Sequence, residues 1–100
     1  MKNWHTEETE TLFRAILSLR TVEECGAFFE DACTIKEITE IAQRLKVAKL
    51  LQQGTSYNAI SEETGVSTTT ISRVNKCLAY GNGGYALVLE RIKESEEMGS

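Results

Sequence analysis

Six residues between positions 67 and 76 have side chains that could contact a nucleic acid: Ser67, Thr68, Thr69, Ser72, Arg73 and Lys76. Their spacing predicts that most of them lie on the exposed N-terminal part of one helix, which Ser67 caps. Hydroxyl groups on short side chains can reach base edges, phosphates or a thymine methyl, directly or through water. The two cations can contact phosphates. This segment is therefore the first candidate for a functional surface.

The elements that would hold this surface form a predicted helix-turn-helix over about residues 56–80. Ser56 can cap a first short helix, and Gly65 permits the positive φ of a tight turn. The apolar contact between the two helices is expected from three residues, Ile60, Val66 and Ile71. In this motif the N-terminal part of the second helix enters the major groove of DNA.

The first helix of the motif offers three further DNA-contacting candidates, Tyr57, Asn58 and Ser61. Their hydroxyl and amide groups can bond phosphate oxygens, and the small side chain of Ser61 lets the two helices cross closely. An ordinary helical hairpin is the alternative interpretation of the same pattern. The joint spacing of small residue, glycine, apolar residue and Ser-Thr cap favours DNA binding.

Apolar residues at helical spacing predict six helices, with no convincing strand alternation. The expected ranges are 6–20, 21–32, 34–53, 56–64, 67–80 and a last helix after Gly84. Thr21 and Glu24, like Thr34 and Glu37, are spaced as capping boxes. The apolar face of 34–53 is wide enough to predict burial on more than one side. The polar tail 94–100 is expected to fray.

Composition and charge narrow the classes of function. The 100 residues predict a single domain, 1–100, and the net charge of −4 argues against bulk electrostatic binding to nucleic acid. Residues 34–80 nevertheless hold six basic and four acidic residues, so a polyanionic partner should meet the middle of the chain.

Other chemistry finds little support in the sequence. No segment has the length and hydropathy of a membrane span or a secretory signal, so a cytoplasmic location is expected. No catalytic frame, cofactor motif or metal pattern is found, and His5 is the only histidine. We therefore expect no enzyme, no cofactor and no metal site. The three cysteines are expected to be small buried apolar residues.

Residues 34–80 resemble the Trp repressor superfamily, and more closely its YerC/YecD-type branch. The resemblance is carried by TIKEI, IAQRL and LLQQG, and by TGVSTTTISRVNKCL at residues 64–78. It implies an all-α, six-helix fold and an intertwined homodimer with two DNA-reading heads. It also implies repression by binding a pseudo-palindromic operator on double-stranded DNA, with half-sites about one helical turn apart.

The resemblance also places an effector pocket. In the Trp repressor, tryptophan lies between the helix-turn-helix and the dimer core, and the matching positions here are Thr34, Arg44, Thr70, Arg73, Val74 and Cys77. Val74 replaces a glycine that leaves room for the ligand, and Cys77 replaces a serine that contacts its amino group. A valine would fill space that the indole needs, and a thiol is a weak hydrogen-bond acceptor. Tryptophan is therefore not expected to be the effector.

Two hypotheses from different classes follow. The first is a sequence-specific DNA-binding repressor. The second is a helical protein-interaction module with a vestigial helix-turn-helix, consistent with the net charge of −4. A basic, hydroxyl-rich surface on the second helix of the motif would favour DNA, and an acidic or apolar one would favour protein.

Overall fold

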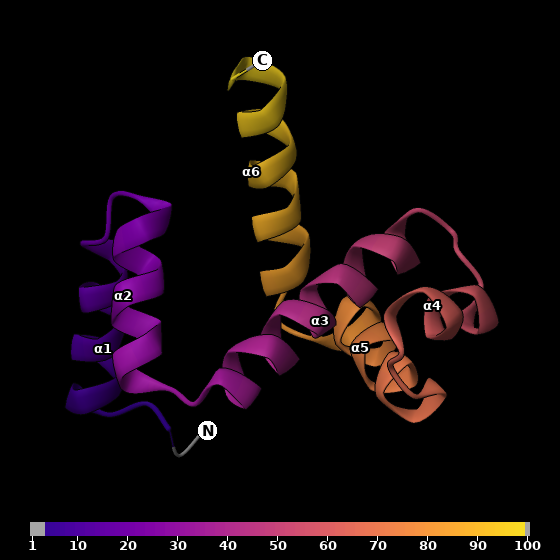
Figure 1. The fold of residues 1–100 in the computed structure, drawn as a ribbon, viewed down its shortest axis with the longest axis horizontal. Coiled ribbons are helices and arrows are strands. Elements are labelled where there is room, and N and C mark those ends of the chain that lie inside the picture. Colours follow the sequence, from indigo (N-terminus) through magenta and orange to yellow (C-terminus); the bar gives the residue numbers. More distant parts are fainter. Residues whose placement is uncertain (1–3, 100) are drawn as a thin grey trace. The chain divides into compact units, whose positions relative to one another are not determined.

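The computed structural model describes residues 4–99 and, within them, an all-α chain without strands. Six helices follow one another along the sequence, coloured from indigo to yellow in Figure 1: α1 Glu7–Leu17, α2 Val22–Ala32, α3 Ile35–Gln52, α4 Tyr57–Thr64, α5 Thr68–Tyr80 and α6 Gly84–Gly99. The predicted number, order and type of elements are confirmed. The predicted helix at 6–20 is shorter than expected, because Ser18 caps it at its C-terminus.

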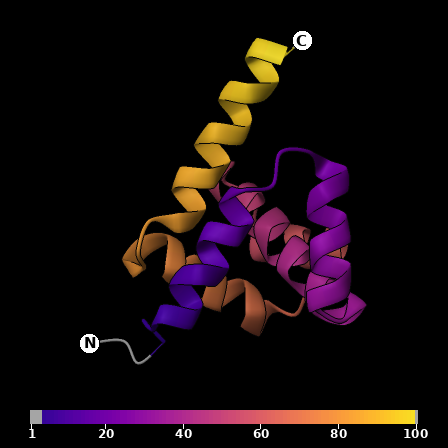
Figure 2. The same cartoon turned by 90° about the vertical axis from the view of Figure 1, so that its left-hand side faces the viewer.

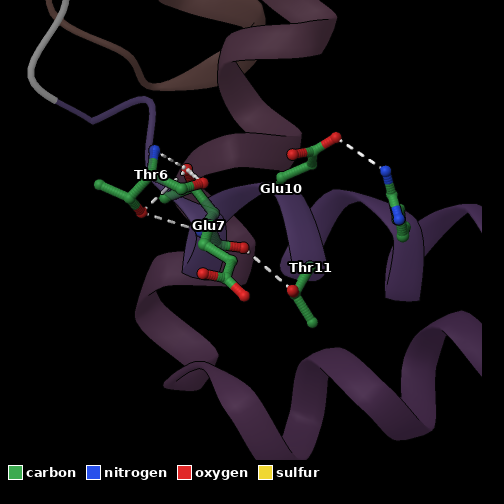
Figure 3. Close-up of polar contacts among 6 residues, drawn as sticks. Thr6, Glu7, Glu10 and Thr11 are labelled. Carbon is green, nitrogen blue, oxygen red and sulfur yellow. Dashed lines mark hydrogen bonds and ion pairs between the residues drawn. The ribbon is translucent and has the colours of Figure 1, made fainter.

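The chain divides into two compact units, residues 1–38 and 39–100. In the first unit, α1 and α2 run in opposite directions and are joined by a short loop (Figure 1). Thr6 caps α1: its hydroxyl accepts a hydrogen bond from the Thr9 amide at 3.1 Å, and the Thr9 hydroxyl accepts one from the Thr6 amide at 2.9 Å. Figure 3 shows this cap and, one turn on, the Thr11 hydroxyl donating to the carbonyl of Glu7 at 2.9 Å.

The two capping boxes expected from the sequence differ in outcome. At α3 the box is complete, because the Glu37 amide donates to the Thr34 hydroxyl at 3.1 Å and the Thr34 amide donates to the Glu37 carboxylate at 2.8 Å. At α2 the Thr21 hydroxyl accepts from the Glu24 amide at 3.0 Å, but the Glu24 carboxylate accepts from Arg20, one residue before the cap. The reciprocal bond predicted for Thr21 therefore moves one position towards the N-terminus.

The second unit is held together by a small apolar core contributed by α3, α4 and α5. Its fully or almost fully buried side chains are Val47, Ala48, Ile60, Ile71 and Val74. Six half-buried residues pack against them, Leu50, Leu51, Val66, Leu78, Tyr85 and Leu89. Helix α5 contacts both α4 and α6. The predicted contacts of Ile60, Val66 and Ile71 are confirmed. Full burial of a side chain such as Ile60 or Ile71 stabilises the fold by about 1.5–3 kcal/mol.

Two glycines shape the chain around the predicted helix-turn-helix. Gly54 has a φ of 82°, and its amide donates to the carbonyl of Leu51 while the Thr55 amide donates to that of Leu50. These two bonds form a Schellman motif that ends α3. Gly65 has a φ of 77° and ends α4, donating to the Ser61 carbonyl at 2.8 Å. Both positions need the left-handed backbone conformation that glycine adopts without strain.

The tail behaves differently from its prediction. Helix α6 continues as one unbroken helix to Gly99, as Figure 2 shows, although fraying was expected from residue 94. Glutamate and lysine are strong helix formers, and this local preference is enough to extend α6. Ser100, the last residue of the predicted tail, lies outside the described residues.

Burial within the single chain is lower than the sequence predicts. Of the apolar residues in α3 only Val47 and Ala48 are buried, and Ile35 is 75% exposed, so burial on more than one side is not found within one chain. The cysteines are not buried either: Cys25 and Cys77 are exposed and Cys33 is half-buried. Cys25 lies on α2, in which no residue is buried. None of the helices described has the length and apolar character needed to cross a membrane.

Candidate nucleic-acid interface

The recognition surface is the outward face of α5, defined here by Thr69, Arg73 and Lys76. These residues are spaced i, i+4 and i+7, so they lie on one side of the helix. All three are exposed. The buried residues Ile71 and Val74 lie on the opposite side and anchor α5 to the core. The helix therefore buries its apolar face and presents a hydroxyl and two cations to solvent.

Two further residues lie at the start of α5, one that caps the helix and one that is exposed to solvent. Ser67 is the N-cap, and its hydroxyl accepts a hydrogen bond from the Thr70 amide at 3.3 Å. Thr68, next to it, is exposed. The cap satisfies one of the free amides at the helix start, and the remaining ones give this end of α5 a partial positive charge. The N-terminal end of α5 is thus suited to approach an anionic backbone.

Two predicted contact residues are less accessible than expected. Ser72 is half-buried rather than exposed, because it follows the buried Ile71 at the border between the two faces of α5. Ser61, which follows the buried Ile60 on α4, is also half-buried. Tyr57 and Asn58, in the first turn of α4, are exposed.

A polar cavity of about 250 Å³ lies beside the first turn of α5 and is called here the guanidinium cavity. It is lined by residues of α3, of α5 and of the turn between α4 and α5: Glu40, Gln43, Arg44, Val66, Ser67, Thr70 and Arg73. Arg44 is half-buried and Arg73 is exposed. The structure brings together three of the residues predicted for an effector pocket, Arg44, Thr70 and Arg73.

A larger apolar cavity of about 630 Å³ lies between α3, the C-terminal end of α5 and α6. Its lining includes Ile41, Leu45, Cys77, Tyr85, Val88 and Ile92. Ile41, Val88 and Ile92 are exposed in the single chain. The second unit therefore presents a hollowed apolar face in addition to its polar one.

A sequence profile of the Trp repressor protein family matches residues 7–93, which cover α1 to α5 completely and α6 as far as Lys93. The chain belongs to the Trp repressor protein family. The uncharacterized protein YerC of Bacillus subtilis (strain 168) is 54% identical over 90 residues, covering 90% of this chain and 86% of YerC. Both the resemblance to this superfamily and that to its YerC-type branch are confirmed.

Solved structures support the same assignment. The crystal structure of a TrpR-like protein from Eubacterium eligens ATCC 27750 matches with a TM-score of 0.86 and 53% identity, covering 89% of this chain and 92% of that one. A second crystal structure, of a protein from Staphylococcus aureus, matches with the same TM-score of 0.86 and 46% identity, and covers 89% of both chains. The six-helix Trp-repressor-like fold is therefore shown, and membership of the family indicates a DNA-binding regulator.

The other residues predicted for the effector pocket are not among those that line the guanidinium cavity. Val74 does not line the guanidinium cavity, because its side chain is buried in the core with Ile60 and Ile71. Cys77 lines the apolar cavity instead. Thr34 belongs to the first unit, where it caps α3.

Three residues of the guanidinium cavity were not identified from the sequence as parts of a site. Glu40 and Gln43 precede Arg44 on α3, and Val66 follows the glycine turn. The i, i+4 spacing of Glu40 and Arg44 places both on one face of α3 and was the available signal for the first of them. The cavity thus holds two guanidinium groups and one carboxylate. No group of three or more histidine, cysteine, aspartate or glutamate side chains that could hold a metal ion occurs in the described part of the chain.

Proposed function

We propose that this protein is a single-domain, sequence-specific transcriptional regulator, a cytoplasmic repressor that binds a pseudo-palindromic operator as a homodimer. The recognition surface of α5 carries the proposal. Thr68 and Thr69 are exposed at the start of a helix whose opposite side is buried, which is the arrangement that a major-groove reader needs. Arg73 and Lys76 follow on the same helix and would contact the flanking phosphates.

The same surface weighs against the second hypothesis, a protein-interaction module. That hypothesis expected an acidic or apolar surface on α5. The recognition surface carries a hydroxyl group on Thr69 and cations on Arg73 and Lys76, and α5 contains no acidic residue. A surface of this composition suits a polyanion better than an apolar or basic protein partner.

A second copy of the chain is the proposed cover for the apolar cavity. Val88 lies on the wall of the apolar cavity and is exposed. In the first unit, Leu12 and Phe13 of α1 are exposed as well. Pairing of two chains would remove such surfaces from water. We expect Val88→Glu to yield monomers in sedimentation experiments, whereas Ala86→Glu, exposed on the same helix outside the cavity lining, should leave dimers. A wild-type protein that is monomeric at micromolar concentration would contradict the proposed dimer.

Free tryptophan is proposed not to be the effector. Six of the seven residues lining the guanidinium cavity are polar or charged, and Val66 is the single apolar one. An indole ring gains most of its binding free energy from burial against apolar side chains. The cavity offers few of these, so calorimetry should detect no stoichiometric binding at micromolar tryptophan.

Selection of bound sequences from random duplexes tests the proposed function directly. The purified full chain should enrich a pseudo-palindrome with half-sites about one helical turn apart. Thr69→Ala should reduce the enrichment or change the sequence that is enriched, because it removes an exposed hydroxyl without touching the core. Thr11→Ala, also at an exposed helical threonine but on α1, is the matched control and should select the same sequence as the wild type. No enrichment at low salt would favour the protein-interaction module.

A further inference from the structure

The two arginines of the guanidinium cavity have no protein partner among the described residues. Elsewhere in the chain, Arg14 pairs with Glu10 at 2.9 Å and Lys46 pairs with Glu63 at 3.4 Å. By contrast, neither Arg44 nor Arg73 makes a hydrogen bond or an ion pair with any described residue. Arg44 is also half-buried. A guanidinium that has lost part of its water shell, with its donors unused, favours an external oxyanion.

The remaining lining of the cavity also suits an oxyanion. Ser67 and Thr70 add two hydroxyl groups, whose oxygens lie 3.2 Å apart. They belong to the first turn of α5, where the helix dipole favours negative charge. Glu40 opposes an anion, but two guanidinium groups against one carboxylate leave the cavity with a net charge of +1. Guanidinium groups match phosphate oxygens in bidentate geometry.

The position of the cavity identifies the source of the oxyanion. Ser67 and Thr70 lie on its wall, and Thr68 and Thr69 between them are exposed. When these two threonines enter the groove, the phosphates that border the groove come next to the same helical turn. We propose that a backbone phosphate of the bound duplex occupies the guanidinium cavity and contacts Arg44 as well as Arg73. The protein would then bind DNA without a small-molecule effector. This inference rests on the proposed function and adds Arg44, from α3, to its DNA contacts.

The decisive variant is Arg44→Gln, tested by fluorescence anisotropy with the selected duplex over a series of salt concentrations. We expect binding to weaken about tenfold or more, because a charge-assisted hydrogen bond is lost. The plot of log K against log salt should flatten by about 0.9 for each lost phosphate contact, or about 1.8 for a dimer. Lys36→Gln removes the same charge from an exposed position on α3 outside the cavity and should change both quantities much less. Wild-type affinity and slope in Arg44→Gln would overturn the inference.

A second variant keeps the test decisive if Arg44→Gln fails to fold. Glu40→Gln removes the one carboxylate of the cavity and should strengthen DNA binding several-fold, a gain that damage to the fold would not produce. Unchanged or weaker binding by a folded Glu40→Gln would overturn the inference.

Chemically altered duplexes and free phosphate distinguish the source of the oxyanion. A single neutral methylphosphonate, moved along the half-site, should find a position that weakens wild-type binding and has no further effect on Arg44→Gln. Absence of such a position would overturn the inference. Inorganic phosphate, exchanged for chloride at constant ionic strength, should leave DNA affinity unchanged or lower it. A rise would mean that a free anion acts as effector, which also overturns the inference. If the wild type binds no duplex at all, the proposed function itself fails.

Discussion

The ammonium nitrogen of Lys46, on α3, lies 3.4 Å from a carboxylate oxygen of Glu63, on α4, and joins the helix-turn-helix to the longest helix. Both side chains remain accessible, at 57% and 50% exposed, so water and salt screen the pair. We predict that Lys46→Ala lowers the free energy of unfolding by less than about 1 kcal/mol. Ile60→Ala, at a fully buried position, should lower it by about 2–5 kcal/mol. Urea unfolding measures both, and equal losses would contradict this account of what holds α4 in place.

Gly65 at the turn of the helix-turn-helix should not tolerate alanine. No atom lies within 4 Å of an added Cβ, so the effect arises from the backbone φ of 77°. The left-handed conformation costs an alanine about 1–2 kcal/mol, and Gly65→Ala should lower the free energy of unfolding by that amount. Gly26→Ala is the matched control, because Gly26 lies inside α2 with open space around it and should gain about 0.5–1 kcal/mol. Thermal unfolding measures both variants, and a shift of Tm in the same direction for Gly65→Ala and Gly26→Ala would contradict the prediction.

Glu37 should make stability depend on pH at the start of α3. Hydrogen bonding to the backbone amide of Thr34, and to a smaller extent to its side-chain hydroxyl, lowers the pKa of the Glu37 carboxyl below its ordinary value of 4.5. A lowered folded-state pKa stabilises the fold above the unfolded value, and this contribution is lost as pH falls through the folded pKa. Urea midpoints of wild type and Glu37→Gln should therefore differ at neutral pH and converge below about pH 4.5. A difference that grows towards acid pH would contradict the assignment.

Val74 should act through the core rather than through an effector pocket. Its side chain is 2% exposed and packs with Ile60 and Ile71, so Val74→Ala should lower the free energy of unfolding by about 2 kcal/mol. Because Val74 does not line the guanidinium cavity, the smaller side chain should not create a tryptophan site. Titration calorimetry of both proteins with tryptophan should give no stoichiometric heat. Binding gained by Val74→Ala would show that valine fills the ligand's space directly.

Local signals explain why the helix order and the helix-turn-helix could be predicted from the sequence. Ser56 and Ser67 cap α4 and α5 as expected, and Gly54 and Gly65 end α3 and α4 with positive φ. Each of these features depends on residues only a few positions apart, and their chemistry acts within one turn. The apolar residue pattern likewise predicted that Ile71 is the contact of α5 with α4, although Val74 was assigned to an effector pocket and is buried beside it.

Features that depend on residues far apart in the sequence could not be predicted in the same way. Cys77 was expected near the effector pocket by resemblance, but the packing of α5 on α6 places it in the apolar cavity. Glu40 and Gln43 join Arg73 in the guanidinium cavity because α3 lies beside α5 and the turn between α4 and α5. The site residues themselves remain predictions that the binding experiments test.

The first turn of α5 assigns surface chemistry and helix stability to different residues. Thr68 and Thr69 are exposed, and neither hydroxyl makes a hydrogen bond among the described residues, whereas Ser67 and Thr70 close the cap. Replacing the two exposed threonines therefore costs the fold little. Under the proposed function, the preferred DNA sequence could therefore be altered at these two positions while the fold that carries them stays unchanged.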